Sequence, residues 1–539
     1  MDPPEIRALW VDAFHAGIRS PQEADDLVAA ARRANLNTLF VQVRRRGDAL
    51  YTKGVEPPLD DPAYDPTFDA LAYTITAAHA AGLEVHAWMN AMPTWRDELP
   101  PRDARHLFNT HGPHAPRDEN WFTASPGGEH RFPVGYFVDP GHPAAAAYVA
   151  ELYVSLVRNY AVDGIHFDYI RYPETEGSLP RGAAVGYNAV NLARFRRATG
   201  RADTPEPGDE AWIAWRRRQV TDLVRRVSIE ARAVNPRIKI SAALIPWGPP
   251  PGGENDFADA APMQRIFQDW HQWLRDGLID LAVPMNYARE TDARVRNWFD
   301  GWIRWEKRHK HGRQLAVGLG AYRNSPEHLL AQVARARKRK GRHRADGVSF
   351  FSYASPRLQP EPAPAGALPP VAELPVAGPE RLAFLADGAG GVPAAFARPA
   401  PVPEMPWIER PERGWIAGVV TAGASGPADG AEVKAKRLGG FSWFRRAHRT
   451  STDGNGYFGF TNLKPGRYRV WLPEKRAQSP FFPGLGKTVT VPVSAGRVTR
   501  VGASGPPVAE PRAPSPPRLL ETRPAPRKKR PSPAAPVHR

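Results

Sequence analysis

The stretch Val162–Pro173, "VDGIHFDYIRYP", sets one acidic residue, Asp168, into an apolar, β-branched and aromatic run that is typical of a buried strand. Because side chains alternate along a strand, His166 and Asp168 share one face of it. Burying a carboxylate without a partner is costly. We therefore expect Asp168 either to belong to a structural salt bridge, with Arg44 or Arg171 as its partner, or to work at the mouth of a site.

Seven other strand-like runs accompany this one, and most are followed by a helical pattern. They begin at Ile6, Asn37, Glu84, Lys239, Leu278, Gln314 and Gly347. In the first helical pattern, Ser20 suits the N-cap and Pro21 the first helical position. Strand and helix repeated eight times predict a (β/α)8 TIM barrel. The alternative, a doubly wound open sheet, is disfavoured because no Gly-rich phosphate loop follows the first strand.

Composition divides the chain into four predicted parts. A TIM barrel covers residues 1–356, a Pro/Ala/Gly-rich linker residues 357–413, a small all-β sandwich residues 414–504, and a disordered, basic, Pro-rich tail residues 505–539. The linker follows from its density of prolines. The sandwich follows from five short strand-like runs separated by tight turns such as "TDGNG" and "KPG".

Charge and cysteine content narrow the classes of partner. The net charge of +17 is compatible with an anionic polymer, but many of the cations lie in the tail and in "RARKRKGRHR". We expect solvated or nonspecific electrostatic contacts there, with no specific nucleic-acid recognition. The chain contains no cysteine, which excludes disulfides and cysteine nucleophiles. No apolar run approaches the ~20 residues of a membrane span. "MDPPEIRALWVDAF" lacks the pattern of a signal peptide, so none is expected in this chain.

Polar and aromatic residues gather near the predicted carboxyl ends of the strands. In a barrel such residues converge on one site, and long connections such as Pro93–Gly141 tend to form its walls. His86 and His166 suit hydrogen-bonded positions inside the barrel better than catalytic bases. The candidate substrate-binding residues are Asp12, Gln42, Arg44, Asp48, His86, Trp88, Asn90, His166, Arg171, Trp247, Asn286, Tyr287 and Tyr322.

Carboxylates with cationic and aromatic neighbours suit glycoside chemistry. An oxocarbenium-like transition state needs one carboxylate as nucleophile or base and a second carboxyl as proton donor. Asp168 is the first candidate, with Glu290 as the preferred partner and Glu174 as the second choice; an ordinary loop glutamate is the alternative for either. The histidines around His111 and His114 have poor metal spacing. We expect no metal and no cofactor.

Several stretches carry a resemblance to a known family. "RALWVDAF", "NTLFVQVRRRGDALY", "AHAAGLEVHAWMN", "FVDPGHPAAAAYV", "VDGIHFDYIRYP", "DLAVPMNY" and "GLGAYR" occur in order between Glu5 and Pro356. Together they resemble the bacterial glycosyl-hydrolase-like family 10 proteins. The resemblance implies a TIM-barrel glycosidase-type domain, and some members act on peptidoglycan glycan strands. Many members carry a second Asp where this chain has Tyr169. The stretch "TDGNGYFGFTNLKPGRYRVWLP" resembles a carboxypeptidase-regulatory-like or carbohydrate-binding-like module.

The sequence thus predicts a glycoside hydrolase acting on a bacterial polysaccharide, of the peptidoglycan glycan type, through carboxylate acid/base chemistry at the carboxyl face of the barrel. Two alternatives stay open. One is a catalytically inert barrel that binds glycan, and the other is a basic scaffold whose tail binds anionic cell-wall polymer or nucleic acid. Family members are commonly exported, so the resemblance suggests a periplasmic or extracellular location.

Overall fold

Eight parallel strands form a closed barrel, as the sequence predicts. The computed structural model describes residues 1–175, 182–253, 255–355, 379–421, 426–439, 446–472 and 488–502. Around the barrel the strands follow the order β1-β10-β9-β8-β7-β6-β3-β2. Their bounds are β1 (Ile6–Val11), β2 (Thr38–Arg44), β3 (Glu84–Asn90), β6 (Gly164–Asp168), β7 (Lys239–Leu244), β8 (Leu281–Pro284), β9 (Gln314–Gly320) and β10 (Gly347–Phe351). The first and last strands pair directly, so the barrel has no open edge.

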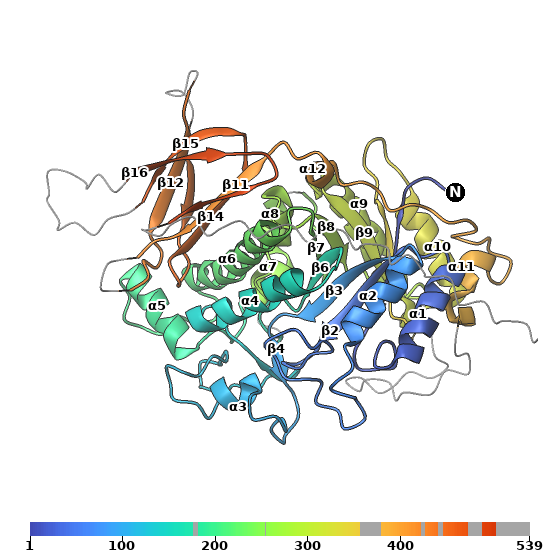
Figure 1. The fold of residues 1–539 in the computed structure, drawn as a ribbon, viewed down its shortest axis with the longest axis horizontal. Coiled ribbons are helices and arrows are strands. Elements are labelled where there is room, and N and C mark those ends of the chain that lie inside the picture. The colour runs from blue at the N-terminus through green and yellow to red at the C-terminus, as the bar shows by residue number, and fades with distance from the viewer. Residues whose placement is uncertain are drawn as a thin grey trace, which may run out of the picture. The chain divides into compact units, whose positions relative to one another are not determined.

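Amphipathic helices cover the outside of the barrel (Figure 1). They are α1 (Pro21–Arg33), α2 (Ala70–Ala80), α4 (Pro143–Asn159), α6 (Glu210–Val234), α8 (Trp270–Arg275), α9 (Ala293–His309) and α10 (Pro326–Arg337). Ser20 caps α1 by accepting a hydrogen bond from the Glu23 amide, as expected. In the described part of the chain, no helix combines the length and apolar character required to cross a membrane.

The connections after β3 and β6 are the long ones. The first contains a short β-ribbon, β4 (Pro93–Trp95) with β5 (Tyr136–Phe137), and the helix α3 (Leu107–His111). The second leads to α5 (Ala189–Thr199). Both leave the carboxyl ends of neighbouring strands, because β3 and β6 pair in the barrel. They therefore stand beside Asp168, the last residue of β6.

Part of the predicted linker belongs to the barrel surface. Leu385 and Phe396 are buried in the main core, and Met405 and Ile408 join the cluster that includes Ile6. The short helices of this segment are η3 (Pro379–Leu382), α11 (Phe384–Asp387) and α12 (Pro406–Glu409), with a further short α7 (Ala261–Arg265) in the barrel. The predicted disordered tail, 505–539, lies outside the described residues.

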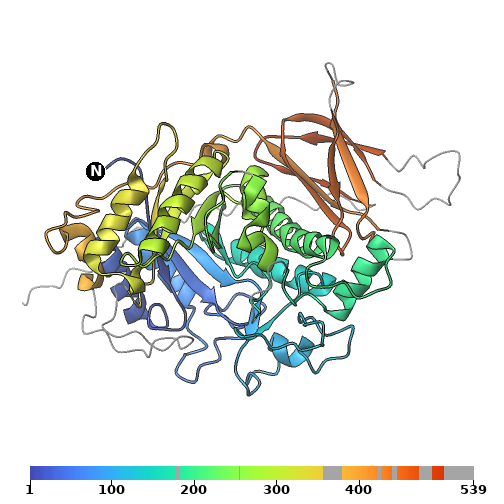
Figure 2. The same cartoon turned by 180° about the vertical axis from the view of Figure 1, so that it is seen from behind.

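The C-terminal β-structure consists of two sheets, with strand orders β14-β11-β17 and β13-β12-β15-β16 (Figure 2). The strands are β11 (Gly414–Val419), β12 (Glu432–Arg437), β13 (His448–Ser451), β14 (Tyr457–Leu463), β15 (Gly466–Trp471), β16 (Thr488–Val493) and β17 (Val498–Val501). The expectation of five strands missed β13 and β17, since "HRTS" and "VTRV" are short and polar. A core that includes Ile416, Val433 and Phe458 lies between the sheets.

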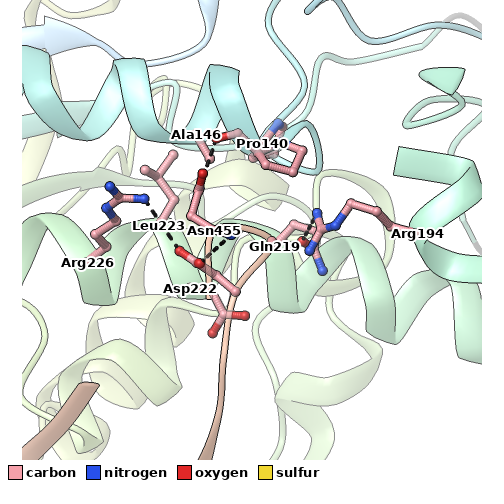
Figure 3. Close-up of a pocket in the computed structure, with 11 residues that line it drawn as sticks. Pro140, Ala146, Arg194, Gln219, Asp222, Leu223, Arg226 and Asn455 are labelled. Atoms are coloured by element: carbon pink, nitrogen blue, oxygen red, sulfur yellow. Dashed lines mark hydrogen bonds and ion pairs between the residues drawn. The ribbon is translucent and has the colours of Figure 1, made fainter. Parts of the chain in front are cut away.

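The sandwich contacts the outer helices of the barrel. The Arg194 guanidinium makes two hydrogen bonds to the Asp429 carboxylate, of 2.8 and 2.9 Å. Figure 3 shows a small pocket beside this contact. At this pocket the Asn455 side chain, from a turn of the sandwich, donates a hydrogen bond of 2.9 Å to the Pro143 carbonyl. Figure 3 also shows Asp222 and Arg226 of α6 lining this pocket. None of the predicted site residues lines it.

Candidate active site

Asp168 is a buried carboxylate at the carboxyl end of β6. It accepts hydrogen bonds from the Tyr169 amide at 2.7 Å and from the Trp88 indole N–H at 3.2 Å. Among the described residues no lysine or arginine forms an ion pair with it, because Arg44 pairs with Glu56 and Arg171 with Glu174. The expected alternative of a structural salt bridge is therefore not what the structure shows.

The environment of Asp168 shifts its acidity. Burial raises its pKa to about 6, against the opposing effects of the Tyr169 amide, the Arg171 charge and the Trp88 hydrogen bond. A carboxyl with a pKa in this range exchanges a proton near neutral pH, which is the property required of a general acid or base.

Aromatic rings and one cation border Asp168 on the side of the β6 loop. Tyr169 has a φ of 47°, which turns the chain sharply out of the strand. The Arg171 guanidinium then lies 4.4 Å from the centre of the Tyr169 ring and 5.3 Å from the centre of the Trp247 ring. Flat rings of this kind are the surfaces on which sugar rings stack, and the cation holds them in place.

Tyr287 and its neighbours form a second aromatic cluster near Asp168. The Tyr287 ring stacks on Phe351 at 5.5 Å and meets Tyr322 edge-on at 6.1 Å. Its hydroxyl is buried and has no hydrogen-bond partner among the described residues. Burial raises the pKa of this phenol well above its usual value, and the charge of Asp168 raises it further. An unpartnered hydroxyl close to Asp168 is available to a bound molecule.

The two glutamates proposed as partners of Asp168 differ in their surroundings. Glu290 receives hydrogen bonds on both oxygens from Arg335 and a third, of 3.2 Å, from Gln332. Its side chain is only 9% exposed. Glu174 leaves the same strand as Asp168, lies 3.2 Å from Arg171 and is 43% exposed. Glu290 is thus held by a cation on α10, whereas Glu174 reaches the solvent beside the site.

His86 and His166 lie inside the barrel. Each places Nδ1 2.9 Å from the Ser241 hydroxyl, and the Trp10 indole N–H donates to His166 Nε2 at 2.9 Å. Because Nε2 of His166 accepts this bond, its proton resides on Nδ1. Burial lowers the pKa of His86 to about 3 and that of His166 well below its usual value. Both rings are neutral, and they tie β1, β3, β6 and β7 together below Asp168.

Arg44 and Asn90 build the wall next to β3. The Arg44 guanidinium lies 2.7 Å from the Glu56 carboxylate and also donates to the Asn90 carbonyl. This ion pair outweighs the effect of burial and raises the pKa of Arg44. Asn90 pairs with Asp168 in the barrel register, and its side-chain oxygen shares the Trp88 N–H with Asp168. Arg44 and Asn90 therefore position the strand end that carries the carboxylate.

Asp12, Gln42 and Asp48 organise the first two loops. Asp12 lies 2.5 Å from His15 Nδ1, and this hydrogen bond raises the pKa of His15. Gln42 accepts from the Ala13 amide at 2.8 Å. Asp48 is buried, accepts from the Arg46 amide at 3.1 Å and holds the turn after β2. Asp12 thus contacts His15, and Asp48 forms an ion pair of 3.1 Å with Arg45.

Asn286 belongs to a separate buried cluster. Its amide donates to both oxygens of Glu306 at 3.0 and 3.1 Å. Burial raises the pKa of Glu306 to about 8, and this outweighs the Asn286 hydrogen bond and the Lys307 charge. Glu306 lies on α9 with an ordinary helical spacing, so no sequence signal distinguished it.

Asp139 is a second buried carboxylate that sequence reasoning did not single out. It accepts hydrogen bonds from the Tyr172 hydroxyl at 2.8 Å and from the Gly141 amide at 2.7 Å. Burial raises its pKa to about 6. The stretch "FVDPGHP" was the available signal. In the described part of the chain, no three His, Asp or Glu side chains come together in a way that holds a metal ion.

Two glycosyl hydrolases are similar to this chain in sequence. The glycosyl hydrolase YngK of Bacillus subtilis is 23% identical over 368 residues, which are 61% of this chain and 65% of YngK. The glycosyl hydrolase DigH of Escherichia coli is 25% identical over 324 residues, which are 56% of this chain and 67% of DigH. The chain thus spans about two thirds of the length of each relative.

Among solved structures, the glycoside hydrolase domain of PgaB (BpsB) from Bordetella bronchiseptica matches with a TM-score of 0.47 and 16% identity, covering 65% of this chain and 94% of that domain. The sequence model of the family described as Glycosyl hydrolase-like 10 matches residues 5–325, which is more than half of the chain and includes Asp168. The chain belongs to the glycosyl hydrolase-like 10 family.

Proposed function

We propose that this protein is a glycoside hydrolase that cleaves a bacterial glycan, with Asp168 as its central acid/base group. The observation that carries the proposal is a buried carboxyl at a barrel strand end that has no cationic partner among the described residues. Burying a carboxyl without a cationic partner costs free energy, and buried groups with shifted pKa values are common at functional sites. Family membership supplies the class of substrate.

Asp168 serves as the proton donor in this proposal. With a pKa of about 6 it is partly protonated near neutral pH. It gives its proton to the glycosidic oxygen as the bond to the anomeric carbon breaks. The Tyr169 amide and the Trp88 indole hold the carboxylate that remains, so the group need not reorient during the step.

Glu174 is the second carboxylate of the proposal. We assign this role to Glu174 rather than to Glu290, because Arg335 binds both oxygens of Glu290. Glu174 lies on the loop that leaves β6, forms an ion pair with Arg171 and is 43% exposed, so a sugar or a water molecule can approach it. It acts either as nucleophile, with retention, or as base toward water, with inversion.

The substrate we propose is a peptidoglycan-type glycan strand. The resemblance of the barrel to proteins that act on such strands supports this choice. The rings of Tyr169, Trp247 and Tyr287 supply stacking surfaces near Asp168, and the free Tyr287 hydroxyl supplies a hydrogen bond to the sugar.

Incubation with defined glycan strands, with and without stem peptides, tests the proposal. Mass spectrometry of the products reports cleavage, and NMR of the freshly formed reducing end reports its anomeric configuration. Cleavage products that form with the wild type and not with the Asp168→Asn variant are expected. Products that form equally with both proteins would remove Asp168 from the mechanism.

One observation favours a second function, a barrel that binds glycan without cleaving it. By the resemblance to its family, Tyr169 occupies the position at which many members carry a second Asp. Binding of the same strands in calorimetry, with no products after prolonged incubation, would support this alternative.

A further inference from the structure

The four-stranded sheet of the sandwich has one face turned away from the core. Side chains alternate along its strands, so Val433 and Ala435 of β12 and Tyr468 and Val470 of β15 face inward and are buried. Their neighbours in the sequence face outward. We call this outward surface of β13, β12, β15 and β16 the basic sheet face.

Cations dominate the basic sheet face. Its charged residues are Lys434, Lys436, Arg449, Arg467, Arg469 and Glu432. Glu432 is thus the single acid among five cations in the described part of this face. The Trp471 ring, which is half-buried, and the threonines of β16 complete the surface.

The strand register brings like charges together. Lys436 lies directly opposite Arg469, and Lys434 lies opposite Arg449 on its other side. Like charges in such cross-strand positions destabilise a sheet. Glu432 relieves the second pair through contacts of 2.9 Å to Lys434 and 2.8 Å to Arg449.

The first pair has no such relief. Lys436, Arg467 and Arg469 form no ion pair with any carboxylate among the described residues. Arg467 and Arg469 are both exposed and project from the same face of β15, so they add to the positive potential around Lys436. The sheet therefore keeps a repulsive arrangement that a negatively charged partner would relieve.

We propose that the basic sheet face binds an anionic polysaccharide and holds it to the protein, outside the barrel. Charge complementarity selects a polymer with regularly repeated negative groups, since the cations are spread over three adjacent strands. The Trp471 ring, beside Lys434 in the register, supplies a flat surface for a sugar. The choice of a polysaccharide over a nucleic acid rests on the proposed function of the barrel.

Binding of defined polymers to the full-length protein tests this inference. The probes are alginate as a polyanionic polysaccharide, dextran as a neutral one, and single-stranded DNA of matched charge. We expect alginate to bind, dextran not to bind, and DNA to bind more weakly than alginate. Raising the salt concentration should weaken alginate binding, because exposed charges are screened.

Charge reversal on the face gives the sharper result. Lys436→Glu should weaken alginate binding about 5-fold, and Lys436→Glu with Arg469→Glu should weaken it by roughly 25-fold. The single variant should also raise Tm, because it replaces a repulsive cross-strand pair with an attractive one. Weaker alginate binding together with a higher Tm is expected of a binding surface that is kept at a cost in stability. If the sheet had only a structural role, Lys436→Glu would lower both alginate binding and Tm, or change neither.

Arg339→Glu with Arg342→Glu is the matched control, since both arginines are exposed on the barrel and the net charge changes equally. This control should change alginate binding by less than about 2-fold. Equal loss in the control and in the Lys436/Arg469 variant would overturn the inference, as would DNA binding tighter than alginate binding. Because Asp168→Asn should bind alginate normally, failure of the barrel as a hydrolase and failure of this surface are distinguishable.

Discussion

The ends of β6 and β8 look alike in the sequence, because an acidic residue lies at or just after each strand, but the two carboxylates have different surroundings in the structure. Each strand is followed by a region with an acidic residue, Asp168 at the end of β6 and Glu290 six residues after β8. Asp168 forms no ion pair with a cation among the described residues, and two neutral donors support its carboxylate. Glu290 gives both oxygens to Arg335. A carboxylate at a barrel mouth is therefore a catalytic candidate only if no basic residue of a neighbouring helix reaches it.

The largest expected effect comes from Asp168→Asn. The substitution removes the transferable proton and leaves the volume almost unchanged, so glycan cleavage should fall by at least about 1,000-fold while the fold persists. Product formation by mass spectrometry measures the first effect, and circular dichroism the second. Activity within about 5-fold of the wild type, with normal unfolding, would transfer the catalytic role to another residue.

Glu290→Gln should produce the opposite combination. The variant leaves Arg335 without its bidentate partner and should lower the free energy of unfolding by about 2 kcal/mol, with activity per folded molecule unchanged. Urea unfolding measures the first quantity. The double variant Glu290→Gln with Arg335→Gln should recover part of the loss, because it removes the cation that has lost its bidentate partner and keeps only the 3.3 Å contact to Asp300. A Glu290→Gln protein that is stable but inactive would show that Glu290 has a catalytic role and not the structural role described here.

The raised pKa of Asp168 predicts the direction in which the free energy of unfolding changes with pH, and stability measurements can check it. The folded value, about 6, lies above the ordinary value of 3.8, so the folded protein binds this proton more tightly than the unfolded chain. The stabilisation is fully present below about pH 4 and is lost as the pH rises to about 6 and beyond. The free energy of unfolding of Asp168→Asn, measured relative to that of the wild type, should therefore rise by about 2–3 kcal/mol when the pH is raised from 4.5 to 7.5.

Asp139→Asn is the control for this titration. Its carboxyl is buried, with a pKa also raised to about 6, but it donates no proton to the substrate in our proposal. Both variants should flatten the pH dependence of unfolding, and only Asp168→Asn should abolish cleavage. An Asp168→Asn protein whose unfolding keeps the wild-type pH dependence would show that the carboxyl is not desolvated.

The barrel was predictable because the sequence patterns that indicate its strands and helices each lie within a short stretch of the chain. Apolar runs followed by helical periodicity marked all eight strands, and the cap at Ser20 marked the first helix. The polar residues at the strand ends were predictable in the same way. Their partners were not, because Arg335 lies 45 residues from Glu290 and Ser241 lies 155 residues from His86. Which cation reaches which carboxylate depends on helix placement, and periodicity carries no information about it.

The smallest expected effect concerns Tyr287→Phe. The Tyr287 hydroxyl makes no hydrogen bond among the described residues, so its removal should leave Tm unchanged or slightly higher. With a glycan bound, the variant should lose one hydrogen bond to the sugar and about 10-fold in kcat/KM. Tyr322→Phe is the control, because the Tyr322 hydroxyl already accepts from Arg323 at 3.0 Å. If both variants lower kcat/KM equally and both lower Tm, the Tyr287 hydroxyl acts only through the packing of its ring. If Tyr287→Phe alone loses activity and keeps the wild-type Tm, the free hydroxyl is a group that binds the sugar.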